Sequence, residues 1–471
     1  MQTTQRPSGF SVLLWVLCLS ALAVGAKNFE QGGIGVDGPH YAVVAREMAR
    51  SGDWFFMRGT IPDYQPAADY PHLGIWLIAS VFSVLPAADW TARIPGILFY
   101  VGFLLVFFRL LRLIDGPRLA VAGTLALWVM YRFSNFFSNV YLDPGMVFFG
   151  MASLLLAYEG VKAQSPLRLL IAGCCLALSF MMKGMAAAGF VPAIGFTLLW
   201  GAPGRNARHA FWNVTCFVLG FATVLGLYLL AVEARVPGLL EKYWSRQWTN
   251  RFSQQRDWSR LWEWRYWGGL LRDCHYFLLL GAVGCLWKWP RRMGLVPWIA
   301  IASFSALYAP IDRVGNQYWL ALLPWIAWVF ASVFVGRREW KPEPWMLVSG
   351  VAAVVLLFFV QFTPVRVHGP EAPDVAHLQR RMAQGIYQRL VLDSAPQPAD
   401  FTRKDHYYWY GDTPIVTLER NDPALRPDPA ALYLLHNHTE NRAKELKALG
   451  WCLDELFPES RSFWRACPLG T

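Results

Sequence analysis

Charged residues, histidines and grouped cysteines are all scarce in this sequence. Charged residues make up 16% of the 471 residues, whereas about a quarter is usual in soluble domains. The eight cysteines are scattered, and none has the spacing of a metal site. The net charge of +11 comes without a basic stripe among exposed aromatics, so we expect no nucleic-acid partner. Apolar residues are abundant instead, at 55% of the chain, and this composition is typical of a membrane protein.

Apolar runs of membrane-crossing length recur through most of the chain. A spanning helix needs about 20 apolar residues, with a lower limit near 17. The run 71–86 has only 16 residues between two prolines, so we expect a short helix lying in the interface. The sequence therefore predicts a mainly α-helical, polytopic bundle of about eleven spans. We expect the first of these to be a membrane span and not a cleaved signal peptide. The expected spans are approximately 10–26, 94–113, 118–134, 146–161, 167–182, 185–200, 212–232, 275–289, 295–310, 317–335 and 345–362.

The positions of Lys and Arg predict the orientation of this bundle. If the N-terminus is cytoplasmic, every short cytoplasmic loop is basic, as the positive-inside rule requires. The extracytoplasmic face then receives the long loops 27–93 and 233–274 and the tail 363–471. Counting 71–86 as a span would put the basic loops on the wrong side. The basic residues of the predicted cytoplasmic loops are Arg109, Arg112, Arg118, Lys162, Arg168, Arg205, Arg208, Lys288, Arg291, Arg292, Arg337, Arg338 and Lys341.

The tail differs in composition from the membrane module, for which we predict the bounds 1–362. Beyond residue 362 the hydrophobic density falls, and proline and charge increase. Two strand-like runs, 414–418 and 431–435, precede a helix-like segment at 441–449 that stops at a glycine, a common C-cap signal. We therefore expect a small extracytoplasmic α/β domain at 363–471. Its Cys452 and Cys467 could form one disulfide on that face.

Three acidic residues lie at loop edges on the predicted extracytoplasmic face. Asp37 precedes an expected helix whose buried face includes Tyr41, and it either caps that helix or acts in chemistry. Asp69 stands just before the short 71–86 helix, where it either ends a loop or binds a divalent cation. Asp143 precedes Pro144, so capping of the next helix and a functional role are both open.

Basic and aromatic residues accompany these acids on the same face. Lys183 lies between two spans, where it either snorkels to the headgroups or binds a lipid phosphate. Arg251 belongs to a loop rich in Trp and Arg, which suits either an interfacial belt or anionic headgroups. Arg313, five residues before Tyr318, adds another cation next to a span.

Five stretches together make the sequence resemble the lipid-linked-sugar glycosyltransferases of the GT-C fold. Within that fold the chain is most similar to the bacterial aminoarabinose lipid A transferases and the related protein O-mannosyltransferase-like (dolichyl-phosphate-mannose-protein mannosyltransferase) enzymes. The matching stretches, in the family's order, are Asp37–Trp54 (DGPHYAVVAREMARSGDW), Asp69–Trp76 (DYPHLGIW), Tyr141–Pro144 (YLDP), Met182–Gly184 (MKG) and Arg313–Pro324 (RVGNQYWLALLP).

The resemblance implies an inverting sugar transfer from a polyprenyl phosphate, on the periplasmic side of a bacterial inner membrane. Asp37 and Asp143 fall on the family's two loop acids and are the expected catalytic residues. Tyr70 replaces the family's phosphate-binding lysine, and Gly38 replaces its second acid. A cation elsewhere would then have to bind the phosphate. The expected substrate-binding residues are Asp69, Tyr70, His72, Tyr41, Lys183, Arg251, Arg313 and Tyr318.

The resemblance leaves cofactor and acceptor open. No cofactor is certain, and Asp37 and Asp69 could hold a divalent metal cation. The acceptor would be a hydroxyl or phosphate of lipid A, a protein or a surface glycan. The alternatives are a transporter or flippase, an oligosaccharide ligase with a diphosphate-linked donor, and a scaffold acting through its tail. Because transporters place charges within their spans and these spans are almost free of acids, the sequence favours chemistry on lipid-borne substrates at the membrane surface.

Overall fold

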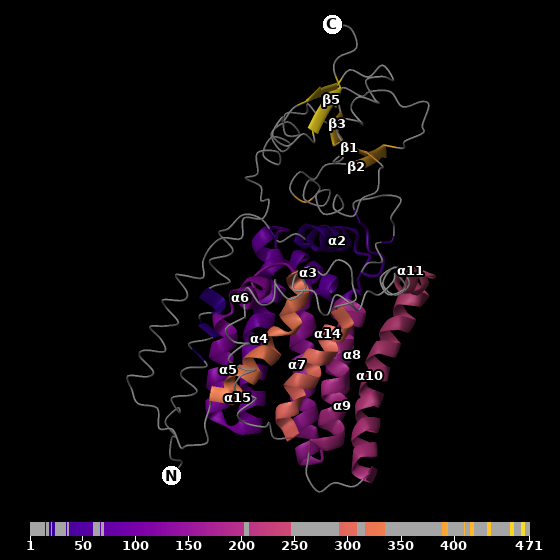
Figure 1. The fold of residues 1–471 in the computed structure, drawn as a ribbon. Helices are drawn as coiled ribbons and strands as arrows, with labels where there is room; N and C mark the ends of the chain where they lie inside the picture. Colours follow the sequence, from indigo (N-terminus) through magenta and orange to yellow (C-terminus); the bar gives the residue numbers. More distant parts are fainter. Residues whose placement is uncertain are drawn as a thin grey trace, which may run out of the picture.

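The computed structural model describes the helical part of the chain and a sheet in the tail (Figure 1). The described residues are mainly 37–59, 70–201, 207–245, 292–308 and 316–334. Isolated positions before residue 70, Trp409 and five strands complete them. The predicted spans 275–289 and 345–362, and most of 10–26, lie outside these residues.

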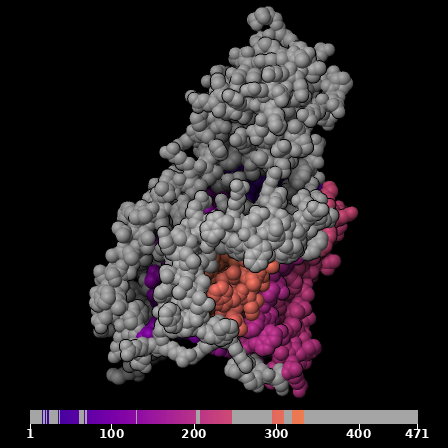
Figure 2. All heavy atoms as spheres, in the orientation of Figure 1, coloured from indigo at the N-terminus to yellow at the C-terminus, as the bar shows by residue number. Residues whose placement is uncertain are grey.

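Four helical runs in the described part are long and apolar enough to cross a membrane. They are α4 (Asp89–Asp115), α7 (Asp143–Ala163), the run Pro166–Trp200 and α10 (Ala207–Arg235). The run Pro166–Trp200 contains α8 (Pro166–Lys183), the 3₁₀ segment η2 (Gly184–Phe190) and α9 (Val191–Trp200). Such runs identify an integral membrane protein. In Figure 2, α10 lies along one flank of the molecule, and its exposed apolar side chains include Trp212 and Leu230.

Three predicted spans are not continuous α-helices, and the one expected at 185–200 begins as η2 before α9. The span expected at 118–134 is divided into α5 (Pro117–Val129) and α6 (Tyr131–Phe137), because Met130 takes an extended conformation with ψ 103°. The span expected at 317–335 begins as the 3₁₀ segment η6 (Asn316–Ala321) before α15 (Leu323–Phe334). The segment η5 (Arg292–Leu295) and α14 (Val296–Tyr308) agree with the span expected at 295–310.

Aromatic packing and close helix contacts hold the bundle together. Tyr100 and Phe103 of α4 pack on Phe133 and Phe137, whose ring centroids lie 4.6 Å apart. Helices α8 and α10 approach so closely that a Cβ on Gly173 would overlap the backbone of α10. Small residues allow this close approach in membranes, where lipid is as apolar as a leucine side chain.

Three short helices gather at one end of the bundle, called here the α2 end (Figure 1). They are α2 (Gly38–Ser51), α3 (Leu73–Phe82) and α11 (Leu239–Trp244). The 10 residues of α3 span about 15 Å, roughly half of the hydrocarbon core. The prediction that the 71–86 run forms a short helix rather than a span is therefore confirmed.

The tail contains a five-stranded sheet in the order β2-β1-β3-β5-β4. The first three strands in this order are parallel, and β5 pairs antiparallel with both β3 and β4. The predicted strands at 414–418 and 431–435 are confirmed as β2 and β3, whereas the predicted helix at 441–449 lies outside the described residues. The strands are β1 (Arg389–Asp393), β2 (Ile415–Leu418), β3 (Ala431–Leu434), β4 (Leu453–Glu455) and β5 (Phe463–Ala466).

Candidate functional site

A buried ion pair joins Asp143, the first residue of α7, to Lys183, the last residue of α8. Asp143 is 0% exposed and Lys183 is 6% exposed. The two helices are antiparallel, since Ser179 near the end of α8 donates a 2.7 Å hydrogen bond to the carbonyl of Met146 near the start of α7. Gly184 then ends α8 with a φ of +63°, a conformation that glycine adopts without strain.

The ion pair is surrounded by other residues that the sequence singled out. The Lys183 ammonium lies 4.5 Å from the centre of the Tyr318 ring. Tyr41 of α2 packs edge-on against Tyr70, with ring centroids 5.2 Å apart. Burial raises the pKa of Tyr41 far above its ordinary value, and the nearby Tyr70, Asp37 and Asp143 act in the same direction, so its hydroxyl keeps its proton. The α2 end therefore gathers acids, a cation and tyrosine hydroxyls in one place.

Neither catalytic candidate makes a side-chain capping hydrogen bond to its helix. Asp37 is the N-cap of α2, but its side chain makes no capping hydrogen bond. Asp143 lies inside α7, whose N-cap is Leu142, and one of its oxygens accepts from Lys183. The other oxygen, Oδ1, is buried and has no hydrogen-bond partner among the residues that the structure describes. The capping interpretation was therefore wrong for Asp143, whereas Asp37 occupies the N-cap position of α2 without the side-chain bond of a cap.

His72 connects the start of α3 to two other parts of the chain. Its ring nitrogens lie 2.9 Å from the Tyr228 hydroxyl of α10 and 2.9 Å from the carbonyl of Phe55. A carbonyl can only accept, so Nε2–H donates to Phe55 and Nδ1 accepts from Tyr228. Burial lowers the pKa of His72 below its ordinary value, and the Phe55 carbonyl partly opposes this shift. His72 is therefore a neutral connector at neutral pH.

This neutral state predicts a loss of stability in acid. An unfolded histidine has a pKa of about 6.5, and the folded value is lower. The unfolded chain therefore binds the proton more tightly, so the contribution of His72 is complete above about pH 6.5 and is lost as the pH falls through the folded value. We expect the detergent-solubilised protein to unfold at lower temperature at pH 5 than at pH 7.5. His72→Gln should flatten this dependence.

An apolar pocket of about 580 Å³ lies beside the ion pair. Tyr70 and His72 form one wall, and Gly184, which follows Lys183, forms another. A Cβ on Gly184 would overlap the hydroxyl of Tyr243, so glycine is required where the pocket meets the pair. The remaining walls come from η2, α8, α9, α10, α11 and the loop before α3, through Met57, Pro71, Phe180, Met185, Val191, Phe221, Leu225, Tyr228, Leu229, Val232, Leu239, Leu240, Tyr243 and Trp244.

The remaining predicted site residues Asp69, Arg251 and Arg313 lie outside the described residues. Within the described ranges, no three His, Cys, Asp or Glu side chains group as metal ligands. The pair Asp37 and Asp69 stays a prediction, because one of the two is not described. Tyr228 was not among the residues predicted from the sequence, because a single tyrosine in a span is common. Only its hydrogen bond to His72 identifies its role.

Comparison with known proteins agrees with this architecture. Residues 69–230 match the model of the dolichyl-phosphate-mannose-protein mannosyltransferase family. The crystal structure of ArnT from Cupriavidus metallidurans, bound to undecaprenyl phosphate, matches with a TM-score of 0.72 at 14% identity, covering 96% of this chain and 97% of that one. This chain has the ArnT fold. An Archaeoglobus fulgidus oligosaccharyltransferase resembles the same fold more distantly, with a TM-score of 0.51 at 11% identity over 88% of this chain and 65% of that one.

The ArnT likeness extends to sequence. An undecaprenyl phosphate-alpha-4-amino-4-deoxy-L-arabinose arabinosyl transferase of Edwardsiella ictaluri is 25% identical over 312 residues, which are 64% of this chain. The chain spans about half the length of that curated relative, 51%. The resemblance to GT-C aminoarabinose transferases and mannosyltransferase-like proteins, predicted from five short stretches, is thus confirmed for the fold and for the family model.

Proposed function

We propose that this protein is a membrane glycosyltransferase that moves a sugar from a polyprenyl phosphate to an acceptor hydroxyl or phosphate. The observation that carries the proposal is the apolar pocket ending at a cluster of acids, tyrosines and one buried cation. A lipid-linked sugar has this same division, because an isoprenoid chain is apolar and its phosphate and sugar are polar. The undecaprenyl phosphate bound by ArnT of the same fold supports this donor class.

The donor phosphate would lie where the pocket meets Tyr70 and Lys183. Lys183 supplies a buried cation, which is already paired with Asp143. Tyr70 stands at the position of the family's lysine and would donate a hydrogen bond instead. Lys183 would then be shared between the phosphate and Asp143. Arg251 and Arg313 are further candidates for the same phosphate.

The proposed reaction is a single displacement with inversion. The acceptor oxygen attacks the anomeric carbon, and the bond from that carbon to the phosphate oxygen breaks. The electron pair leaves with the polyprenyl phosphate, whose growing charge Lys183 stabilises. The acceptor proton passes to the carboxylate of Asp37, a general base within the same cluster. The unpartnered Oδ1 of Asp143 would orient the acceptor.

The same proposal includes topology and partners. We place the α2 end and the tail domain 363–471 in the periplasm of a bacterium, with the N-terminus in the cytoplasm. The acceptor is then lipid A, a protein or a surface glycan. The basic loops predicted at the opposite end support this orientation through the positive-inside rule.

Lipid mass spectrometry on a deletion strain tests the proposal. We expect one polyprenyl-phosphate sugar to accumulate and one envelope component to lose the same sugar, and both changes should reverse when the intact gene is restored. A diphosphate-linked donor that accumulates would instead identify an oligosaccharide ligase. A change in the distribution of glycolipids between the two leaflets of the membrane, without loss of a sugar product, would instead identify a flippase.

A further inference from the structure

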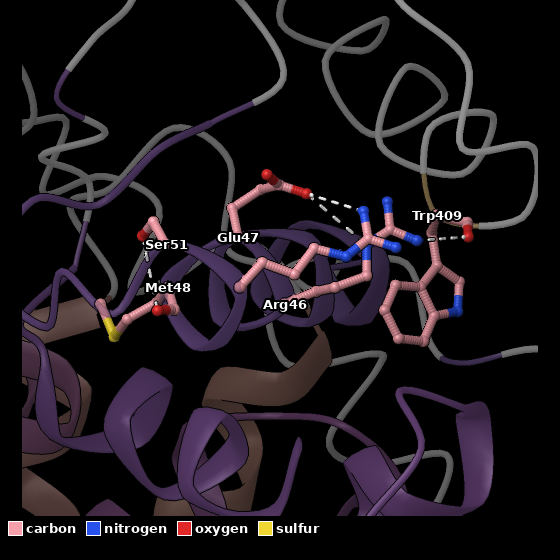
Figure 3. A network of polar contacts seen from close by, with 6 residues as sticks. Arg46, Glu47, Met48, Ser51 and Trp409 are labelled. Atoms are coloured by element: carbon pink, nitrogen blue, oxygen red, sulfur yellow. Dashed lines mark hydrogen bonds and ion pairs between the residues drawn. The ribbon is translucent and has the colours of Figure 1, made fainter. Parts of the chain in front are cut away.

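Trp409 of the tail is seated on the α2 end of the bundle. Its side chain is only 7% exposed, although it is more than 300 residues away in sequence from every contact described here. Figure 3 shows its indole beside the guanidinium of Arg46, which lies 5.1 Å from the ring centre. Arg46 also donates a 3.1 Å hydrogen bond to the carbonyl of Trp409. One arginine therefore holds both the ring and the backbone of this tail residue.

Two further contacts complete the seat of Trp409. Its indole Nε1–H donates a 2.8 Å hydrogen bond to the carboxylate of Asp89, the first residue of α4. Its ring stacks on Phe82, the last residue of α3, with centroids 5.7 Å apart and an angle of 22°. Arg46 and Phe82 contact the flat face of the indole, Asp89 accepts from its N–H, and Arg46 also binds the backbone carbonyl.

Two of the three contacted residues, Arg46 and Phe82, lie on helices that begin at the candidate site, and the third, Asp89, begins α4. Helix α2 begins after Asp37 and carries Arg46 in its last turns, whereas α3 begins after His72 and ends at Phe82. Most residues of α2 from Gly38 to Met48 are buried, so packing holds this part of the helix as one unit. A rigid helix transmits a shift at one end to the other. The position of Asp37 therefore depends on how the end of α2 is held.

We propose that Trp409 is a positioning residue, by which the C-terminal tail fixes α2 and α3 and so the depth and angle of Asp37 and Tyr41. The catalytic part of this statement rests on the function proposed above, whereas the mechanical part does not. A tail that served only as a separate binding module would need no buried tryptophan between three helices of the membrane module.

Hydrogen–deuterium exchange on the full-length protein in nanodiscs tests the mechanical part. Trp409→Ala should raise exchange of the α2 amides of residues 41–48 about tenfold, because local opening becomes easier. The matched control is Trp212→Ala, which removes a lipid-facing tryptophan of α10 that is 55% exposed and should leave α2 unchanged. Trp409→Phe keeps the stack on Phe82 and loses the bond to Asp89, so it should give an intermediate rate and serves if the alanine variant does not fold. Unchanged α2 exchange in both Trp409 variants would overturn the proposal.

Activity and lipid binding test the catalytic part. Sugar transfer in the complemented deletion strain should fall about 10- to 100-fold in Trp409→Ala, as misplaced catalytic groups do. Binding of undecaprenyl phosphate should stay within about threefold, because the pocket itself is not lined by Trp409. Equal losses of binding and transfer would show a general structural role and overturn positioning. If the wild type transfers no sugar while Trp409→Ala still loosens α2, the proposed function fails and the mechanical coupling remains.

Discussion

Replacing Asp37 by asparagine should reduce sugar transfer about 100- to 10,000-fold, the range by which a positioned general base accelerates a reaction. Asparagine has the same shape as aspartate and cannot take the acceptor's proton. Because the Asp37 side chain makes no capping hydrogen bond, the variant should fold and express as the wild type does. The measurement is product formation in membranes of the complemented deletion strain, scaled to protein level.

Asp53→Asn is the matched control for this loss. Asp53 lies in the same matching stretch as Asp37, namely Asp37–Trp54. Its Oδ1 accepts hydrogen bonds from the backbone N–H groups of Phe55 and Phe56. Asparagine keeps that oxygen, so activity should stay near the wild-type value. Retained activity in Asp37→Asn would remove Asp37 from the base role and leave Asp143 as the remaining described acid of the cluster.

The short helix α3 shows how much of the fold could be predicted from the sequence. Its apolar run is too short to cross a membrane, and that one length places Asp37, Asp143 and Lys183 at the same end of the bundle. Run lengths and loop charges also predicted α4, α7 and α10 closely. The break between α5 and α6 was missed because it depends on the backbone of Met130 alone, and no glycine or proline marks it in the sequence.

The sequence predicted which residues belong to the candidate site, but it did not predict which of them contact each other. Each acid or cation at a helix end had both a structural and a functional interpretation, and spacing could not choose between them. The choice depends on long-range geometry, such as Lys183 reaching Asp143 across two helices. Trp409 and Asp89 gave no signal at all, since their contact joins residues 320 positions apart. A tail rich in aromatics does not reveal which of them is buried.

Replacing Lys183 by methionine should be the most damaging change to stability in the described bundle. Methionine keeps the length of the side chain and removes its charge, which leaves the fully buried Asp143 without its cation. Breaking a buried ion pair in this way costs about 3–5 kcal/mol. We expect a large drop in the unfolding temperature in detergent and no measurable sugar transfer.

The double variant Asp143→Asn with Lys183→Met separates stability from function. It removes both charges at once, and replacing a whole buried pair by neutral groups of similar size is often neutral for stability. The unfolding temperature should therefore return most of the way to the wild-type value. Sugar transfer and undecaprenyl phosphate binding should be lost, because Lys183, the cation proposed to meet the phosphate, is gone. If the double variant regains binding as well as stability, Lys183 serves only to neutralise Asp143, and the phosphate must be held by Arg251 or Arg313.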